Sequence, residues 1–229
     1  MSTALMMNDK KKLKITDGHF SGTVVLAKVI SYLFHPVFIP LYAVWFMVYE
    51  HPYLFAGFTP KEKVLVMAQA FAMFTFFPLV TVLLLRALKF IESFHLEKQK
   101  DRIIPLVACG VWYFWIWYVW KNLPDYPKPA VQLALAVFIS SWVGLMMNIR
   151  MKISLHAIGA GVLIMFILLL AFTQQLNFGI YISIALLIAG MVCTARFIVS
   201  NHTAREIYGG LLAGFVSMLV AYWSDNFFS

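Results

Sequence analysis

Seven apolar segments, each near the length that crosses a lipid bilayer, occupy most of the chain and leave it few ways to fold. They run over residues 24–48, 64–85, 103–120, 130–149, 153–173, 178–195 and 207–223. A transmembrane helix needs about 20 mostly apolar residues. Backbone groups in lipid must pair within the protein, as helices allow, and the alternation typical of an outer-membrane barrel is missing. The pattern predicts an all-α, polytopic membrane helix bundle with six or seven transmembrane helices.

The composition excludes a soluble domain. The chain is 62% hydrophobic and 12% charged, whereas soluble domains carry about 25% charged residues. Its net charge of +8 at pH 7 comes mostly from basic residues at the ends of apolar segments. Such placement favours anionic headgroups of membrane lipids as partners, and the lack of a continuous basic stripe argues against nucleic acid.

The chain divides into a short tail and one membrane domain. Residues 1–19 form a basic, polar N-terminal tail, and residues 20–229 form the transmembrane domain. The first apolar segment contains His35-Pro36 and Pro40, so we expect a kink there because proline removes a helical hydrogen bond.

Charge asymmetry predicts the orientation. If all segments cross, the connections 86–102, 150–152 and 196–206 share one side with the N-terminus. That side holds every Lys and Arg except Lys61, Lys63, Lys121 and Lys128. The excess of basic residues marks the cytoplasmic side, so we expect a multi-pass protein of the inner (cytoplasmic) membrane.

The third apolar segment carries a dense aromatic run: Trp112, Tyr113, Trp115, Trp117, Tyr118 and Trp120. Such a run is typical of the aromatic belt at a membrane interface. The alternative is a wall that lines a groove for a lipid tail.

Three polar clusters follow on the basic side. The first holds Lys98, Lys100 and Arg102, the second holds Lys152, Ser154 and His156, and the third holds Arg196, His202 and Glu206. Each has a plain structural interpretation: a solvated loop, a packed histidine with a lysine that reaches toward water, and a capping box formed by Thr203-Ala204-Arg205-Glu206. Ionisable groups at membrane depth are nevertheless candidates for function.

The order of these clusters resembles the type 2 phosphatidic acid phosphatase superfamily, which includes membrane lipid phosphatases and vanadium haloperoxidases. Its signature is Lys-x6-Arg-Pro, then Pro-Ser-Gly-His, then Ser-Arg-x5-His-x3-Asp. The third motif matches here as Ala195-Arg196-x5-His202-x3-Glu206, and the second as Ile153-Ser154-Leu155-His156. The first is degraded: Arg102 lacks an adjacent Pro, and Lys98 or Lys100 stands in for the spaced Lys.

The resemblance implies a role for each matching residue. His202 would be the nucleophile that forms a phosphohistidine, and Glu206 would orient its imidazole. His156 would protonate the leaving lipid oxygen and then activate water. Cationic and hydroxyl groups would hold the phosphoryl oxygens: Arg196, Arg102, Lys98, Lys152 and Ser154. We expect no metal and no other cofactor, because the basic residues supply positive charge and acidic residues are few and scattered.

The sequence therefore predicts an integral membrane, metal-independent lipid phosphatase. Its substrate would be a lipid phosphate: phosphatidic acid, phosphatidylglycerophosphate or a polyprenyl pyrophosphate. A site on the cytoplasmic side would favour phosphatidylglycerophosphate, whereas an outward-facing site, usual in similar proteins, would favour the polyprenyl carrier. The alternatives are a non-catalytic transporter or binding protein for anionic lipids, and a lipid phosphotransferase that passes the phosphoryl group to another alcohol. The oligomeric state stays open.

Overall fold

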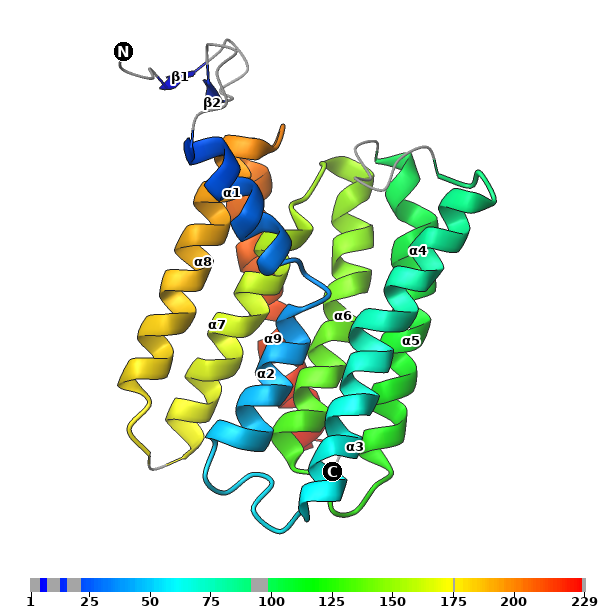
Figure 1. Cartoon of the computed structure of the whole chain (residues 1–229), viewed down its shortest axis with the longest axis vertical. Coiled ribbons are helices and arrows are strands. Elements are labelled where there is room, and N and C mark those ends of the chain that lie inside the picture. The colour runs from blue at the N-terminus through cyan, green and yellow to red at the C-terminus, as the bar shows by residue number, and fades with distance from the viewer. Residues whose placement is uncertain (1–4, 8–12, 16–21, 92–98, 175, 228–229) are drawn as a thin grey trace.

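A bundle of long helices makes up almost all of the computed structural model, which describes residues 5–7, 13–15, 22–91, 99–174 and 176–227 (Figure 1). Within these residues, six helical spans are long and apolar enough to cross a membrane. They are Pro60–Ala87, Lys100–Lys121, Lys128–Arg150, Leu155–Thr173, Gly179–Val199 and Ala204–Asp225. The prediction of an all-α, polytopic membrane bundle is confirmed.

The first apolar segment is broken in two. Helix α1 (Gly22–Leu33) ends before His35-Pro36, and α2 (Ile39–Trp45) starts after it and runs into a π-helical turn, Phe46–Glu50. Proline has no amide hydrogen to give to the preceding turn, and Pro36 is followed by Pro40 near the start of α2. The expected kink is thus a complete break, and α1 lies tilted across α7 and α8 in Figure 1.

Side chains satisfy the backbone carbonyls that the break exposes. The last carbonyls of a helix lack intrahelical partners. The Tyr42 hydroxyl donates to the carbonyl of Leu33 at 2.8 Å, and the Thr75 hydroxyl donates to that of Val37 at 2.9 Å. These bonds hold the break in one geometry.

The second span combines three pieces: α3 (Pro60–Ala70), a π-helical turn (Phe71–Phe76) and α4 (Phe77–Ala87). The wider turn comes just before Pro78, which cannot donate to the preceding turn and whose ring would crowd it. Helix α3 begins with a capping box, in which Thr59 and Glu62 bond each other's backbone N–H groups.

The other helices alternate in direction through short connections. They are α5 (Ile103–Lys121), preceded by a 3-10 turn (Lys100–Arg102), α6 (Lys128–Arg150), α7 (Leu155–Thr173), α8 (Gly179–Val199) and α9 (Ala204–Phe227). The last residues of α4, α6 and α8 and the first residues of α5, α7 and α9 lie at the end drawn uppermost in Figure 1, where α1 also begins. The described residues of the three polar clusters predicted to share one side lie at or beside these helix ends.

Glycines bring α7 and α9 into close contact. A Cβ built on Gly214 would lie 1.9 Å from the carbonyl oxygen of Ile158, and one on Gly161 would lie 2.1 Å from that of Leu211. Neither position has room for a side chain, so the two backbones touch as in small-residue packing between membrane helices. This contact sets the relative position of the starts of α7 and α9.

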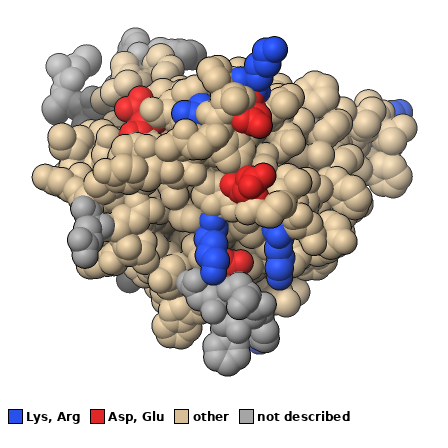
Figure 2. All heavy atoms as spheres, turned by 90° about the horizontal axis from the view of Figure 1, so that it is seen from below, with Lys and Arg blue, Asp and Glu red and all other residues tan. Residues whose placement is uncertain are grey.

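The opposite end of the bundle is sparsely charged. Figure 2 views this end and shows scattered basic and acidic side chains among uncharged ones. Its basic residues are Lys61, Lys63, Lys121 and Lys128, and its acidic residues are Glu50, Glu62, Asp125 and Asp225. The two sets balance, so the net charge of +8 comes from the rest of the chain.

Two very short strands lie within the N-terminal tail. Strands β1 (Leu5–Met7) and β2 (Leu13–Ile15) pair antiparallel, with Leu5 opposite Ile15. The sequence reading of a basic polar tail did not anticipate this pairing.

Candidate functional site

A cavity of about 590 Å³ lies at the end of the bundle where the polar clusters meet. We call it the polar cavity. Four cationic side chains and three histidines line it: Lys28, Arg102, Lys152, Arg196, His35, His156 and His202. None of the described residues that line it carries a carboxylate. The cavity therefore presents positive charge to whatever enters it.

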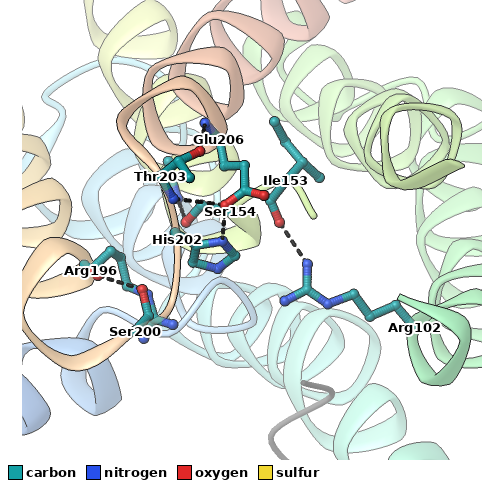
Figure 3. A network of polar contacts seen from close by, with 9 residues as sticks. Arg102, Ile153, Ser154, Arg196, Ser200, His202, Thr203 and Glu206 are labelled. Atoms are coloured by element: carbon teal, nitrogen blue, oxygen red, sulfur yellow. Dashed lines mark hydrogen bonds and ion pairs between the residues drawn. The ribbon is translucent and has the colours of Figure 1, made fainter. Parts of the chain in front are cut away.

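Direct hydrogen bonds join the three clusters. The Arg102 guanidinium, at the start of α5, donates from Nη1 to the carbonyl of Ile153 at 2.7 Å. The next amide, that of Ser154, donates to the carbonyl of Glu206 in α9 at 3.2 Å. Figure 3 shows these contacts converging around His202. Hydrogen bonds to backbone carbonyls thus hold the three clusters together, although they lie some fifty residues apart in the chain.

His202 sits beside a carboxylate that also caps a helix. Its Nδ1 lies 3.4 Å from Oε2 of Glu206, and the same oxygen accepts the amide N–H of Thr203 at 2.8 Å. The Thr203 hydroxyl in turn accepts the amide N–H of Glu206 at 3.3 Å. The capping box and the histidine contact, which the sequence presented as alternatives, are both formed.

The surroundings of His202 keep its imidazole neutral at pH 7. Burial, reinforced by the nearby charges of Arg196 and Arg102, lowers the pKa of His202 to about 4 despite the opposing effect of Glu206. The carboxylate beside Nδ1 favours the tautomer with the proton on Nδ1. Nε2 then carries a lone pair, as a nucleophile requires.

Two guanidinium groups flank this imidazole. In Figure 3, Arg102 reaches toward His202 from the 3-10 turn that precedes α5, and Arg196 lies on the other side, on α8. The Nε atom of Arg196 is buried and has no hydrogen-bond partner among the described residues. Buried polar groups are nearly always paired, so this donor is suited to an anionic ligand.

His156 is anchored by the broken first segment. Its Nε2 lies 3.0 Å from the carbonyl oxygen of Ser31, in the last turn of α1. A carbonyl only accepts, so Nε2 carries the proton and Nδ1 is the nitrogen that can take up a second one. The break before α2 therefore provides the acceptor that orients this histidine.

Helix dipoles add to the positive potential of the polar cavity. Helices α5, α7 and α9 begin beside Arg102, His156 and His202, all of which line it. The N-terminal end of a helix carries about half a positive elementary charge and unpaired N–H groups. Three such ends at one cavity favour a bound anion.

An apolar cavity of about 140 Å³ adjoins the polar one. His35, Pro36 and Leu155 line both. The rest of the lining is mainly apolar and comes from α2, α4, α5, α6 and α7. A polar cavity and a mainly apolar one thus lie next to each other within the bundle.

The sequence left two interpretations of the aromatic run of α5 open: an interfacial belt and a wall that lines a groove. Some of its residues fit the first interpretation and one fits the second. Tyr113 lines the apolar cavity, as a groove wall would. Trp115 and Tyr118 are about half exposed, as expected for an interfacial belt, and Trp120 is buried and donates to Gln69 at 3.0 Å.

Most of the predicted site residues come together. Five of them line the polar cavity: Arg102, Lys152, His156, Arg196 and His202. Glu206 is not among the lining residues but contacts His202. Leu155, the bulky residue in place of the expected glycine, also lines it.

Two predicted phosphate ligands do not join this set. Ser154 is fully buried and is not among the lining residues; its hydroxyl caps α7 by accepting the amide N–H of Ala157 at 3.4 Å. Lys98 lies outside the described residues.

The sequence reading missed the contribution of the first segment. Lys28, Ser31, Tyr32 and His35 all line the polar cavity. His35-Pro36 was interpreted as a kink alone. An ionisable residue inside an apolar segment is itself a sign of function, and this rule would have identified His35.

No group of three or more His, Cys, Asp or Glu residues is placed to hold a metal ion in the part of the chain that the structure describes. In comparisons with protein-family models, curated proteins and solved structures, nothing matches the chain.

Proposed function

We propose that this protein is an integral membrane lipid phosphatase, similar to the type 2 phosphatidic acid phosphatases, that works through a phosphohistidine on His202. One observation carries the proposal. A neutral histidine, backed by the carboxylate of Glu206, lines a cavity that holds four cations and adjoins an apolar cavity.

The cationic groups bind the phosphoryl oxygens. A phosphoryl group in transfer spreads negative charge over three equatorial oxygens. Arg196, with its unpaired Nε, and Arg102 flank His202; Lys152 also lines the cavity. Positive charge fixed before the reaction stabilises the transition state without reorganisation.

The reaction has two steps. In the first, which starts with His156 protonated on both ring nitrogens, the lone pair on Nε2 of His202 attacks phosphorus, the bond to the lipid oxygen breaks, and that oxygen takes the proton from Nδ1 of His156. In the second, water attacks the phosphohistidine and gives a proton to His156, the P–N bond breaks, and inorganic phosphate leaves. Glu206 holds the His202 ring and stabilises positive charge that develops on it.

The substrate is a lipid whose phosphate ends at the polar cavity and whose chain enters the apolar one. Phosphatidic acid, phosphatidylglycerophosphate and polyprenyl pyrophosphate all meet this description. The polar cavity lies at the end toward which the charge asymmetry points, whereas the opposite end carries balanced charges. Because basic residues are in excess on the cytoplasmic side of membrane proteins, the site lies at the cytoplasmic face of the inner membrane. This orientation favours phosphatidylglycerophosphate.

Phosphate release from these three lipids, by purified protein in detergent with a chelator present, tests the proposal. Wild type should release phosphate, and His202→Ala and Arg196→Ala should lose at least about 10²-fold in rate. His51→Gln is the matched control, because His51 is also buried but lies at the opposite end, bonded to Gln174. Equal release by all variants overturns the mechanism.

The same assay separates the alternatives. Lipid binding that survives His202→Ala, without phosphate release by any variant, indicates an anionic-lipid binding protein or transporter. Phosphorylated product that forms only when a second alcohol is added indicates a phosphotransferase. Loss of wild-type activity with chelator indicates a metal-dependent reaction.

A further inference from the structure

His35 lies where the two cavities meet. It follows α1 in the break of the first segment, and with Pro36 and Leu155 it lines both the polar and the apolar cavity. Of these three shared residues, His35 alone has a polar side chain. Its imidazole is therefore the polar side chain at the boundary between the cationic pocket and the hydrocarbon-lined one.

A lipid phosphate places one particular atom at such a boundary. Its phosphoryl oxygens belong with the cations, and its chain belongs with apolar side chains. The bridging oxygen joins the two parts, so it must lie near the junction when both are seated. Negative charge develops on this oxygen when the bond to phosphorus breaks.

The protonation of His35 suits a hydrogen bond to that oxygen. The amide N–H of Val37 points to Nδ1 of His35 at 3.5 Å, so Nδ1 is the acceptor and Nε2 carries the proton. Nε2 has no hydrogen-bond partner within the described residues. The ring packs edge to face against His156, with 5.0 Å between centroids. The donor is thus held next to the residue assigned to protonate the leaving group.

We infer that His35 is a further catalytic residue, whose Nε2–H donates a hydrogen bond to the bridging oxygen of the lipid phosphate. This inference rests on the proposed phosphatase function. His35 stabilises the charge that develops on the leaving oxygen, and His156 transfers the proton. Neither the three-motif resemblance nor the cation cluster assigns this role.

A matched pair of substitutions tests the hydrogen bond. His35→Gln keeps an N–H donor near the position of Nε2, whereas His35→Met has similar length and no donor. Each is assayed with a short-chain alkyl phosphate lipid, whose leaving oxygen is strongly basic, and with 4-nitrophenyl phosphate, whose leaving oxygen needs little stabilisation.

We expect His35→Met to lower kcat/KM for the alkyl phosphate by about 10²-fold, as loss of one oxyanion donor does, and for 4-nitrophenyl phosphate by less than about tenfold. His35→Gln should recover most of the loss. His51→Gln should change neither rate.

Other outcomes overturn the inference. Equal losses on both substrates mean that His35 supports only the fold. The same conclusion follows if His35→Met is unfolded and His35→Gln cleaves the alkyl phosphate no faster than His35→Met does. No loss on either substrate removes the role altogether. A wild type that releases phosphate from neither substrate contradicts the proposed function itself, which separates that failure from a failure at His35.

Discussion

Oε2 of Glu206 lies 3.4 Å from Nδ1 of His202 and accepts the amide N–H of Thr203 at 2.8 Å. One carboxylate oxygen therefore orients the proposed nucleophile and caps the helix that begins at Ala204. A cap is a local structural device, and here it also fixes where the orienting carboxylate stands. The Glu206 side chain thus combines a role in helix stability with a role in the proposed catalysis, and substitutions can separate the two.

Glu206→Gln should lose activity while keeping stability. A glutamine carbonyl can still accept the Thr203 N–H, since capping boxes use Glu or Gln. That carbonyl oxygen, in the place of Oε2, also stays beside Nδ1 of His202, but it lacks the negative charge that stabilises positive charge developing on the ring, so kcat should fall by about 10²–10⁴-fold. Glu206→Ala should lose activity to a similar extent and also cost about 0.5–2 kcal/mol of stability. Phosphate release and thermal unfolding in detergent measure the two effects.

The capping box of α3 is a matched control. Glu62 bonds Thr59 in the same pattern at the opposite end of the bundle. Glu62→Ala should lower the unfolding temperature much as Glu206→Ala does, without changing kcat. If Glu206→Gln keeps wild-type turnover, the carboxylate serves the helix alone.

The acid limb of the pH profile should report the lowered pKa of His202. A histidine with a pKa of about 4 stays neutral, and hence nucleophilic, well below the usual 6.5. We expect kcat/KM to persist to about pH 5 and to fall as the pH drops through about 4, once ionisation of the substrate phosphate is allowed for.

Charge substitutions should move this limb in opposite directions. Arg196 lowers the pKa of His202, so removing it should shift the limb to higher pH. Glu206 raises that pKa, so Glu206→Gln should shift the limb to lower pH. The pH dependence of kcat/KM for both variants and for wild type measures the shifts. Ionisation of the substrate is the same for all three proteins, so it does not contribute to the differences between them. Shifts of the same sign would contradict the electrostatic assignment.

Much of the fold and most of the candidate site follow from local patterns in the sequence. Apolar length predicted the membrane helices, because lipid leaves the backbone no other partner. Parity of the connections placed Arg102, Lys152 and His202 at one end, where the structure has them. The capping-box pattern also predicted the start of α9 correctly.

What the sequence did not reveal depends on contacts between distant segments. That α1 would supply the acceptor for His156 depends on where a broken helix packs, which no local pattern specifies. Ser154 matched a motif, yet its hydroxyl caps α7, because a serine before a helix competes for the backbone. The close approach of α7 and α9 depends on which faces their glycines share.

Gly214→Ala should disturb both the fold and the site. Its added methyl group would lie 1.9 Å from the carbonyl of Ile158, so α7 and α9 must separate, at a cost of about 1–3 kcal/mol. Because the same contact positions His156 relative to His202, turnover should fall as well. Gly190→Ala is the control: nothing lies within 4 Å of a Cβ there, and alanine favours the helix by about 0.5–1 kcal/mol. Equal unfolding temperatures for the two variants would contradict the packing account.

Arg196→Met should weaken phosphate binding without lowering stability, whereas a core substitution lowers stability. The Nε atom is buried without a partner among the described residues, so a methionine of similar length relieves an unpaired charge and should leave the unfolding temperature unchanged or raise it. Phosphate release should fall by about 10²–10³-fold. Inorganic phosphate, which we expect to bind the folded state at the polar cavity, should raise the unfolding temperature of wild type but not that of Arg196→Met. Equal protection of both proteins by phosphate would remove Arg196 from the anion site.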